Sequence, residues 1–124
     1  MNFLDQAVVI AIHDRQLAEY GGAAGVRDAG LLDSALSRPQ NKHAYGEDDP
    51  FVLAASYAFG IARNHPFLDG NKRTAWVSAR TFLALNGKAL LPDRKEAVEY
   101  MVHLAEGSFE EAAFAAWLAT QPVR

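Results

Sequence analysis

The sequence contains no cysteine in its 124 residues, which excludes disulfide bonds and thiolate metal sites. A reducing compartment such as the cytoplasm is compatible with that composition. A strong charge of one sign is missing too, because 15 acidic residues face 12 Lys and Arg for a net charge of −3. The chain as a whole therefore has no electrostatic attraction to nucleic acid or to an anionic membrane, and any anion-binding site must be local.

Long apolar runs and targeting signals are also absent. The longest apolar stretch near the N-terminus, residues 7–12, is much too short to span a bilayer. No basic segment and no small-residue cleavage site accompany it, so we expect no signal peptide, no membrane contact and a cytoplasmic location. Internal repeats and low-complexity tracts are missing, and the one candidate strand is the short stretch of residues 89–91.

What the sequence does contain is helical periodicity. Half of the residues are hydrophobic and 22% are charged, which suits a single globular domain over residues 1–124. Apolar spacing and helix-end signals predict six helices that cover about two-thirds of the chain, well above the usual third. The predicted fold class is therefore all-α: a compact six-helix bundle with little or no strand.

Two helices and a long loop are predicted in the N-terminal half. The first helix starts near Leu4, has an apolar and therefore buried first half, and ends near Tyr20. Asp28 is placed to cap the second helix, and Pro39 should stop it. Residues 38–50 then form the longest loop, which is polar and without periodicity. Such a loop is either a solvated connection or a lid or binding loop.

The helices of the C-terminal half have their own boundary signals. The fourth should end at residues 86–87, an Asn-Gly pair typical of helix C-termini. Asp93 with Glu96 marks the start of the fifth helix. Ser108 with Glu111 has the spacing of a capping box and is predicted to open the sixth.

The third helix leads into the most chemically dense stretch of the chain. Residues 51–62 carry apolar side chains at i, i+3, i+4 and i+7 and on other faces too, so we expect the central, most buried helix. Pro66 should end it at His65, because proline disfavours helical geometry in the preceding residue. The sequence then runs His-Pro-Phe-Leu-Asp-Gly-Asn-Lys-Arg over residues 65–73.

The second half of this motif has the chemistry of an anion site. Lys72 and Arg73 fall in the first turn of the fourth helix, where cations oppose the helix dipole. A bound phosphate would remove that conflict, held by free backbone N–H groups together with Asn71, Lys72 and Arg73. Gly70 allows the backbone to approach such a ligand closely. Taken singly, the two cations would be an ordinary solvated face.

The first half of the motif supplies a base and a metal ligand. His65 can accept a proton near neutral pH, and Asp69 beside phosphates is suited to Mg²⁺. Phe67 is expected to anchor the loop in the core. A lone histidine at a helix end is more often a capping group, and a lone Asp is more often an N-cap. The combination in one fixed order favours the functional interpretation.

Residues 65–73 closely resemble the signature of the Fic/Doc superfamily, and specifically its Doc branch. The flanking residues resemble Doc proteins too, with Gly21-Gly22 and residues 25–28 upstream and residues 82–83 and 86–87 downstream. The likeness covers residues 12–91, most of the domain, and the motif is highly specific. The resemblance has implications for the activity, the cofactors and the partners of the chain.

Fic enzymes typically transfer AMP from ATP to a protein hydroxyl and carry a second arginine three residues after the first. That position is Trp76 here, and the middle glycine common in Fic motifs is Lys72. Both departures match the Doc branch, in which the γ-phosphate of ATP is transferred. The resemblance thus implies a protein kinase that is the toxin of a toxin–antitoxin pair, phosphorylates a threonine of elongation factor Tu and blocks translation.

The resemblance also assigns roles to residues and partners. His65 would be the general base, Asp69 would bind Mg²⁺, and the ATP phosphates would be held by Gly70, Asn71, Lys72 and Arg73. Residues 38–49 would be the flap that docks the target segment by strand addition. The self-inhibitory helix of many Fic proteins is not matched, because Val102 stands where Ser or Thr should precede Glu106.

The missing self-inhibitory motif implies a separate, Phd-like antitoxin. We expect no direct contact between this chain and nucleic acid, because its net charge is −3 and it has no basic stripe. Two alternatives remain open from the sequence. The first is a Fic-type adenylyltransferase, which Trp76 disfavours. The second is a non-catalytic module that binds a nucleotide or a protein partner, against which the intact motif argues.

Overall fold

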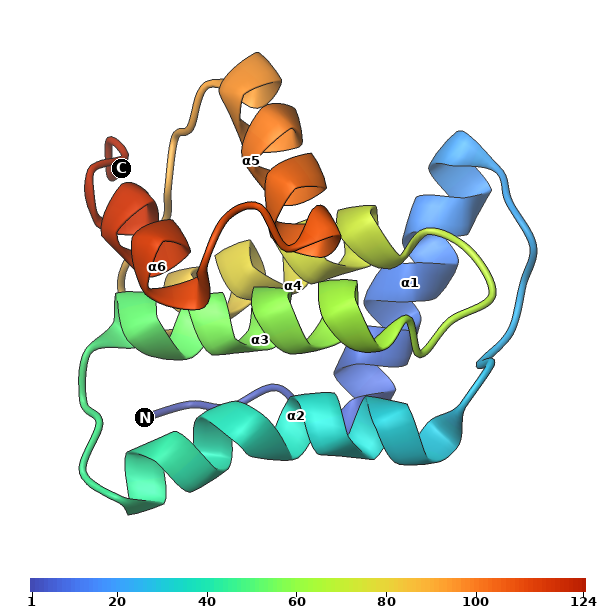
Figure 1. The fold of residues 1–124 in the computed structure, drawn as a ribbon, viewed down its shortest axis with the longest axis horizontal. Helices are drawn as coiled ribbons and strands as arrows, with labels where there is room; N and C mark the ends of the chain where they lie inside the picture. Colours follow the sequence, from blue (N-terminus) through green and yellow to red (C-terminus); the bar gives the residue numbers. More distant parts are fainter.

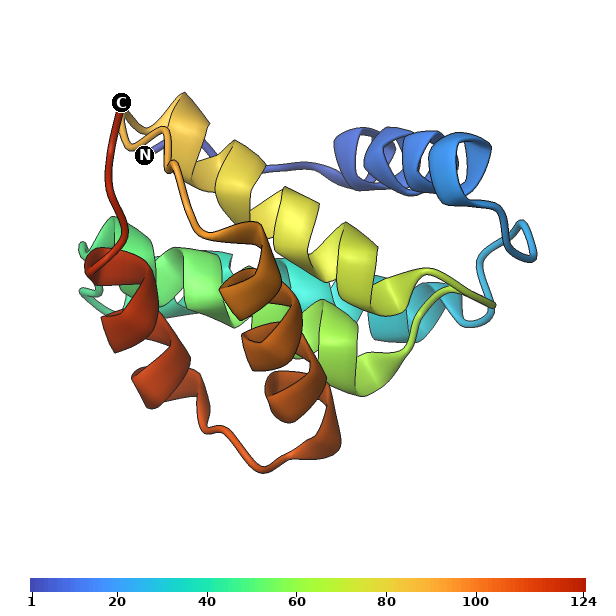
Figure 2. The same cartoon turned by 90° about the horizontal axis from the view of Figure 1, so that it is seen from above.

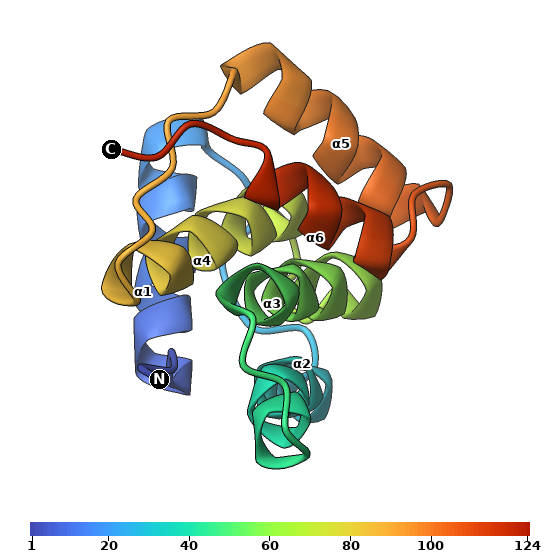
Figure 3. The same ribbon diagram turned by 90° about the vertical axis from the view of Figure 1, so that its left-hand side faces the viewer.

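Helix α3 (Pro50–Asn64) lies at the centre of the fold in the computed structural model, which describes all 124 residues. Nine of its 15 residues are buried, and it packs against α2, α4, α5 and α6. Figure 3 shows α3 end-on, with α2, α4 and α6 arranged around it. The prediction that this helix is the most buried one is confirmed.

Five further helices complete the bundle shown in Figure 1: α1 (Gln6–Tyr20), α2 (Ala29–Ala44), α4 (Asn71–Leu85), α5 (Arg94–Glu106) and α6 (Glu111–Ala119). The predicted all-α class with six helices is therefore confirmed. The only strand-like pairings are two isolated antiparallel bridges, Val26 with Phe67 and Leu90 with Val123. The second bridge falls at the candidate strand of residues 89–91. No helix is both long and apolar enough to cross a lipid bilayer.

Helix α1 is less buried than predicted. Its buried residues form a single stripe, Val9, His13 and Gln16, and Val8 is 38% exposed. The helix lies at the edge of the bundle and packs mainly on α4 (Figure 2), so only one of its faces is covered. The prediction of a fully buried first half is wrong, because the apolar run of residues 7–12 reaches beyond the covered face.

The helix-start signals of α2 and α5 are confirmed, and that of α6 is wrong. Asp28 accepts a hydrogen bond from the Leu31 N–H at 3.0 Å, and Asp93 caps α5 in the same way. Ser108, however, closes α5: its N–H and its hydroxyl both donate to the His103 carbonyl. Glycine at position 107 adopts the left-handed conformation that creates this C-terminal motif. α6 begins at Glu111 without a side-chain cap.

The predicted stop at Pro39 is also wrong, because α2 continues through this residue to Ala44. Proline removes one backbone hydrogen bond there. The loss is offset by burial of Pro39 and by close packing of α2 on α3: a Cβ added to Gly60 would lie 3.1 Å from Ala35. The loop after α2 is therefore only residues 45–49.

That short loop lies at the N-terminal end of α3, whereas the motif of residues 65–73 follows its C-terminal end (Figure 1). The 15 residues of α3 separate the two by about 22 Å. The prediction that residues 38–49 are a flap loop that docks the target segment is wrong, because residues 38–44 are helical and residues 45–49 lie at the far end of α3 from the motif. The segment that lies against the motif is the connection between α1 and α2, residues 21–28.

Candidate active site

His65 ends α3 in a left-handed backbone conformation, with φ 49° and ψ 55°. It is the only non-glycine residue with positive φ in the chain. This conformation costs a residue with a Cβ about 1–2 kcal/mol. Such strain is typical of functional sites, where the surrounding structure holds it in place. His65 is exposed, and it is the one histidine of four whose ring has no hydrogen-bond or ion-pair partner within the chain.

The loop after His65 is anchored in the core, as predicted for Phe67, which is 1% exposed. The ring of Phe67 stacks on the imidazole of His13, with centroids 3.8 Å apart and an interplanar angle of 9°. His13 Nε2 lies 2.8 Å from the carbonyl oxygen of Asp69. Because a carbonyl can only accept, Nε2 carries the proton and donates it. One buried histidine of α1 thus holds the loop of the motif in place, through a hydrogen bond to Asp69 and stacking on Phe67.

Sequence reasoning did not identify His13. The apolar spacing of residues 4–12 did not mark the stripe of Val9, His13 and Gln16 that the structure buries. Nothing in the sequence showed which group the ring of His13 would contact.

Asn71 closes the loop on itself. Its side-chain Oδ1 accepts from the Phe67 N–H at 3.0 Å, and its Nδ2 donates to the Phe67 carbonyl at 2.9 Å. The residue is only 8% exposed. The amide side chain therefore shapes the loop, and the group that Asn71 offers to a ligand is its backbone N–H.

The N-terminus of α4 is open to a ligand. Gly70 is the N-cap, with φ 75° and no side chain to cap the helix. The backbone N–H groups of Asn71, Lys72 and Arg73 donate no hydrogen bond within the chain, and the first intrahelical bond comes from Thr74. Lys72 and Arg73 lie in this first turn, as predicted, and both are exposed. Free N–H groups and two cations at one helix end form an anion-binding site.

All six predicted site residues lie together. A shallow cavity of about 330 Å³ is lined by His65, Leu68, Asp69, Gly70, Asn71, Lys72 and Arg73. The sequence motif thus folds into one surface on which a free imidazole and an anion-binding helix end are neighbours.

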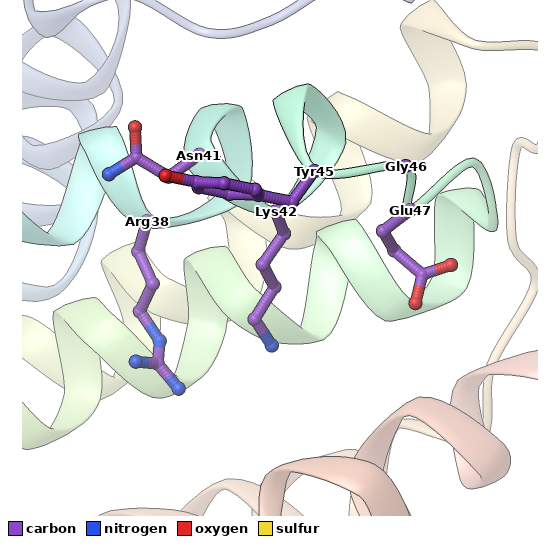
Figure 4. Close-up of a pocket in the computed structure, with 6 residues that line it drawn as sticks. All are labelled: Arg38, Asn41, Lys42, Tyr45, Gly46 and Glu47. Atoms are coloured by element: carbon purple, nitrogen blue, oxygen red, sulfur yellow. The ribbon is translucent and has the colours of Figure 1, made fainter.

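A larger and more open hollow, about 710 Å³, lies along the end of α2 (Figure 4). Its two cations already have a carboxylate partner, because both Arg38 and Lys42 form ion pairs with Glu111 on α6. It contains none of the predicted site residues. Its chemistry is that of a salt-bridged contact between two helices.

Asp69 is exposed, and its two carboxylate oxygens have different surroundings. Oδ1 accepts from the Gly70 N–H at 2.8 Å. Oδ2 lies close to Gly22: a Cβ added to this glycine would be 2.7 Å from the oxygen. The chain has no cluster of three or more metal-ligating side chains. A single carboxylate beside a phosphate site does suit Mg²⁺, which takes one or two protein ligands and completes its shell with phosphate and water. The residues present therefore fit Mg²⁺ bound together with a nucleotide.

Arg73 and Arg80 point to different parts of the molecule. The Arg73 guanidinium lies 5.0 Å from the ring centre of Tyr20 and lines the cavity. Arg80 instead donates to the Leu90 carbonyl at 3.2 Å and lies over Trp76. Burial, with the nearby Arg124, lowers the pKa of Arg80. Trp76 does not line the cavity either.

Comparisons with known proteins agree with the motif. A model of the Fic/DOC family matches residues 3–83. The chain is 36% identical over 116 residues to "Protein kinase doc" of Escherichia phage P1, which covers 93% of this chain and 91% of that protein. It is 51% identical over 77 residues to "Toxin Doc" of Mycolicibacterium smegmatis, covering 60% of this chain and 58% of that protein.

The chain therefore belongs to the Fic/Doc family. Both relatives carry Doc in their names, so the resemblance to the Doc branch inferred from residues 65–73 is confirmed.

Proposed function

We propose that this chain is a Doc-type toxin that acts as a protein kinase, transferring the γ-phosphate of ATP to a hydroxyl group of a target protein. The observation that carries the proposal is the shared cavity of His65 and the α4 N-terminus. Phosphoryl transfer needs stabilisation of phosphate charge and a group that takes the hydroxyl proton. The names of the two relatives, one a kinase and one a toxin, support the same assignment.

His65 is the general base in this proposal. Its exposed ring has no partner within the chain, so a ring nitrogen is free to take the proton of the attacking hydroxyl. The bond between that oxygen and the γ-phosphorus forms as the bond to ADP breaks. The strained backbone of His65 supports this role, because it holds the imidazole at the edge of the phosphate site.

The phosphates are held by the first turn of α4. The backbone N–H groups of Asn71, Lys72 and Arg73 and the two cationic side chains converge there, and Gly70 lets a phosphate come close to the backbone. Asp69 would hold Mg²⁺ beside them, and the ion supplies further neutralisation of phosphate charge when bound.

Transfer of the γ-phosphate rather than of AMP is supported by Trp76. A Fic-type site uses an arginine at this position. Here the indole packs on Trp117, with ring centres 5.7 Å apart, and the nearest following arginine, Arg80, is directed to Leu90. Neither residue places a second arginine, in addition to Arg73, at the cavity.

The target, by analogy with the Doc branch, is a threonine of elongation factor Tu, whose phosphorylation would block translation. A separate Phd-like antitoxin would restrain the toxin, since Val102 leaves the self-inhibitory motif incomplete. We place the protein in the cytoplasm, where ATP and the translation apparatus are found, with no membrane or direct nucleic-acid contact.

Labelled ATP tests the chemistry. The purified protein is incubated with elongation factor Tu, or with a translation extract, and ATP labelled at either the γ- or the α-phosphate. We expect protein labelling from γ-labelled ATP only, and its loss in His65→Ala but not in His103→Ala, an exposed histidine elsewhere. Label from the α-phosphate would identify AMP transfer. ATP binding without transfer of either label would identify a non-catalytic module.

A further inference from the structure

Arg27, in the connection between α1 and α2, is hydrogen-bonded to the end of α3 at the point where His65 adopts its strained conformation. Its Nε donates to the His65 carbonyl at 2.7 Å, and its second guanidinium nitrogen donates to the Asn64 carbonyl at 2.9 Å. The backbone N–H of Arg27 donates to the Pro66 carbonyl, also at 2.7 Å. One residue thus contacts three consecutive carbonyls around His65.

We propose that Arg27 is a positioning residue that holds His65 in the left-handed conformation and so sets the direction of its imidazole. This inference rests on the function proposed above, in which His65 is the base. The last carbonyls of a helix have no partner within the helix and carry partial negative charge. A guanidinium binds two of them at once in a fixed, planar geometry.

The surroundings of Arg27 point to this role rather than to an ordinary ion pair. No carboxylate lies within ion-pair distance of it, so its charge is satisfied by the carbonyls of residues 64 and 65. The side chain does not line the cavity, so it acts through His65 and not on the substrate. Its backbone is fixed in turn by the bridge between Val26 and Phe67 and by the Asp28 N–H, which also donates to Pro66.

The left-handed conformation matters because an ordinary residue leaves it when nothing holds it. A change of φ from 49° to a negative value would rotate the His65 side chain relative to the α4 N-terminus. The anion site itself is built from α4, Asn71 and Phe67, and would stay as it is. Loss of Arg27 should therefore separate the base from the phosphate without removing the phosphate site.

The test compares Arg27→Ala and Arg27→Lys with Arg15→Ala, an exposed arginine of α1 with no hydrogen-bond or ion-pair partner in the chain. We expect Arg27→Ala to lower kcat for γ-phosphate transfer to elongation factor Tu on the order of tenfold to a hundredfold. The KM for ATP should change by no more than about twofold, since the phosphate ligands are intact. Arg27→Lys, which can reach one carbonyl, should lie in between, and Arg15→Ala should match the wild type.

A second measurement does not depend on activity. NMR backbone shifts of His65 report its left-handed conformation, which we expect to disappear in Arg27→Ala and to persist in Arg15→Ala. If the wild type transfers no phosphate, the proposed function fails, while the shifts still decide the role of Arg27.

Three results would overturn the inference. The first is a left-handed His65 in Arg27→Ala. The second is a wild-type kcat in that variant. The third is an equal loss of kcat and of ATP affinity, which would place Arg27 in the phosphate site. If Arg27→Ala fails to fold, Arg27→Lys tests the inference instead. The same two measurements apply: a loss of kcat without a change in the KM for ATP, and the NMR backbone shifts of His65.

Discussion

The imidazole of His13 donates a hydrogen bond to the carbonyl oxygen of Asp69 across 2.8 Å, and so connects the buried face of α1 to the proposed active-site loop. The ring is 1% exposed and is stacked on Phe67. Replacing it with alanine would leave a cavity and an unpaired carbonyl. We expect His13→Ala to lower the free energy of unfolding by roughly 2–3 kcal/mol, measured by urea denaturation.

The control for His13→Ala is Glu19→Ala, an exposed substitution on the same helix. His13→Gln is the more informative variant, because its amide can still donate to Asp69 but cannot stack on Phe67. It should recover part of the stability. Identical destabilisation by Gln and Ala would show that the ring packing contributes everything and the hydrogen bond nothing.

Gly22 should be needed for the position of the Asp69 carboxylate. A Cβ at this residue would lie 2.7 Å from Asp69 Oδ2, so Gly22→Ala must displace the carboxylate. Gly46→Ala is a matched control: its φ of +106° resembles the +124° of Gly22, but nothing lies within 4 Å of the added Cβ. Both variants should lose stability from backbone strain, about 1–2 kcal/mol, and Gly22→Ala should lose somewhat more, because its Cβ would also lie 3.0 Å from Leu17. Only Gly22→Ala should weaken Mg²⁺-dependent ATP binding, which calorimetry measures.

Removal of Mg²⁺ separates the proposed metal-binding role of Asp69 from a structural role, in which its carboxylate only accepts a hydrogen bond from the Gly70 N–H. We expect EDTA to weaken ATP binding to the wild type and to have no further effect on Asp69→Asn, whose affinity with Mg²⁺ present should be on the order of tenfold lower. Asparagine keeps an oxygen that can accept from the Gly70 N–H. A helical circular-dichroism signal that falls in Asp69→Asn would show instead that the residue is chiefly structural.

The helices could be predicted from the sequence because each has an apolar face and most have a local start signal. Asp28 and Asp93 act within one turn of their own helix, so their role depends on nothing distant. Pro39 failed as a stop signal because its cost is offset by packing on α3, a tertiary contact. Ser108 failed because the chain reversal at residue 107 gives its hydroxyl a nearer partner in His103.

The grouping of the candidate site residues could be predicted because it, too, depends on residues that are close in sequence. His65, Asp69 and the residues after them are close in sequence, so their grouping needed no long-range information. What could not be predicted was their support. His13 lies 56 positions from Asp69, and Arg27 lies 38 positions from His65. The assignment of the flap failed for this reason, because only the fold shows that residues 21–28 cross the motif.

Two arginines of α4 should differ in their effect on nucleotide binding. Arg73 lines the cavity at the N-terminus of α4. Arg80 lies about two turns further along the same helix and donates a hydrogen bond to the Leu90 carbonyl. Loss of a charge-assisted hydrogen bond costs about 1.5–3 kcal/mol, so Arg73→Ala should weaken ATP binding roughly tenfold to a hundredfold. Arg80→Ala should leave the affinity unchanged and lower the melting temperature. Equal effects on affinity would mean that the phosphates lie elsewhere.

Tyr57, in the middle of α3, predicts how stability depends on alkaline pH. Burial raises the pKa of its hydroxyl to about 12, although a hydrogen bond from the Leu4 N–H at 2.9 Å acts in the opposite direction. In the unfolded chain a tyrosine has a pKa near 10. Between those two values the folded protein binds the proton more strongly than the unfolded chain does. Its free energy of unfolding therefore falls as the pH rises above 10, by at most about 1.4 kcal/mol per pH unit from this group.

Tyr57→Phe isolates this contribution. The variant should be less stable at pH 7 by about 1–3 kcal/mol, because the buried Leu4 N–H loses its acceptor. The difference from the wild type should be constant below pH 10 and should shrink above it, since only the wild type has a buried hydroxyl to ionise. Tyr45→Phe, at a residue that is 93% exposed, serves as the control and should follow the wild type. A difference that stays constant up to pH 11 would show that Tyr57 ionises no less readily in the folded protein than in the unfolded chain.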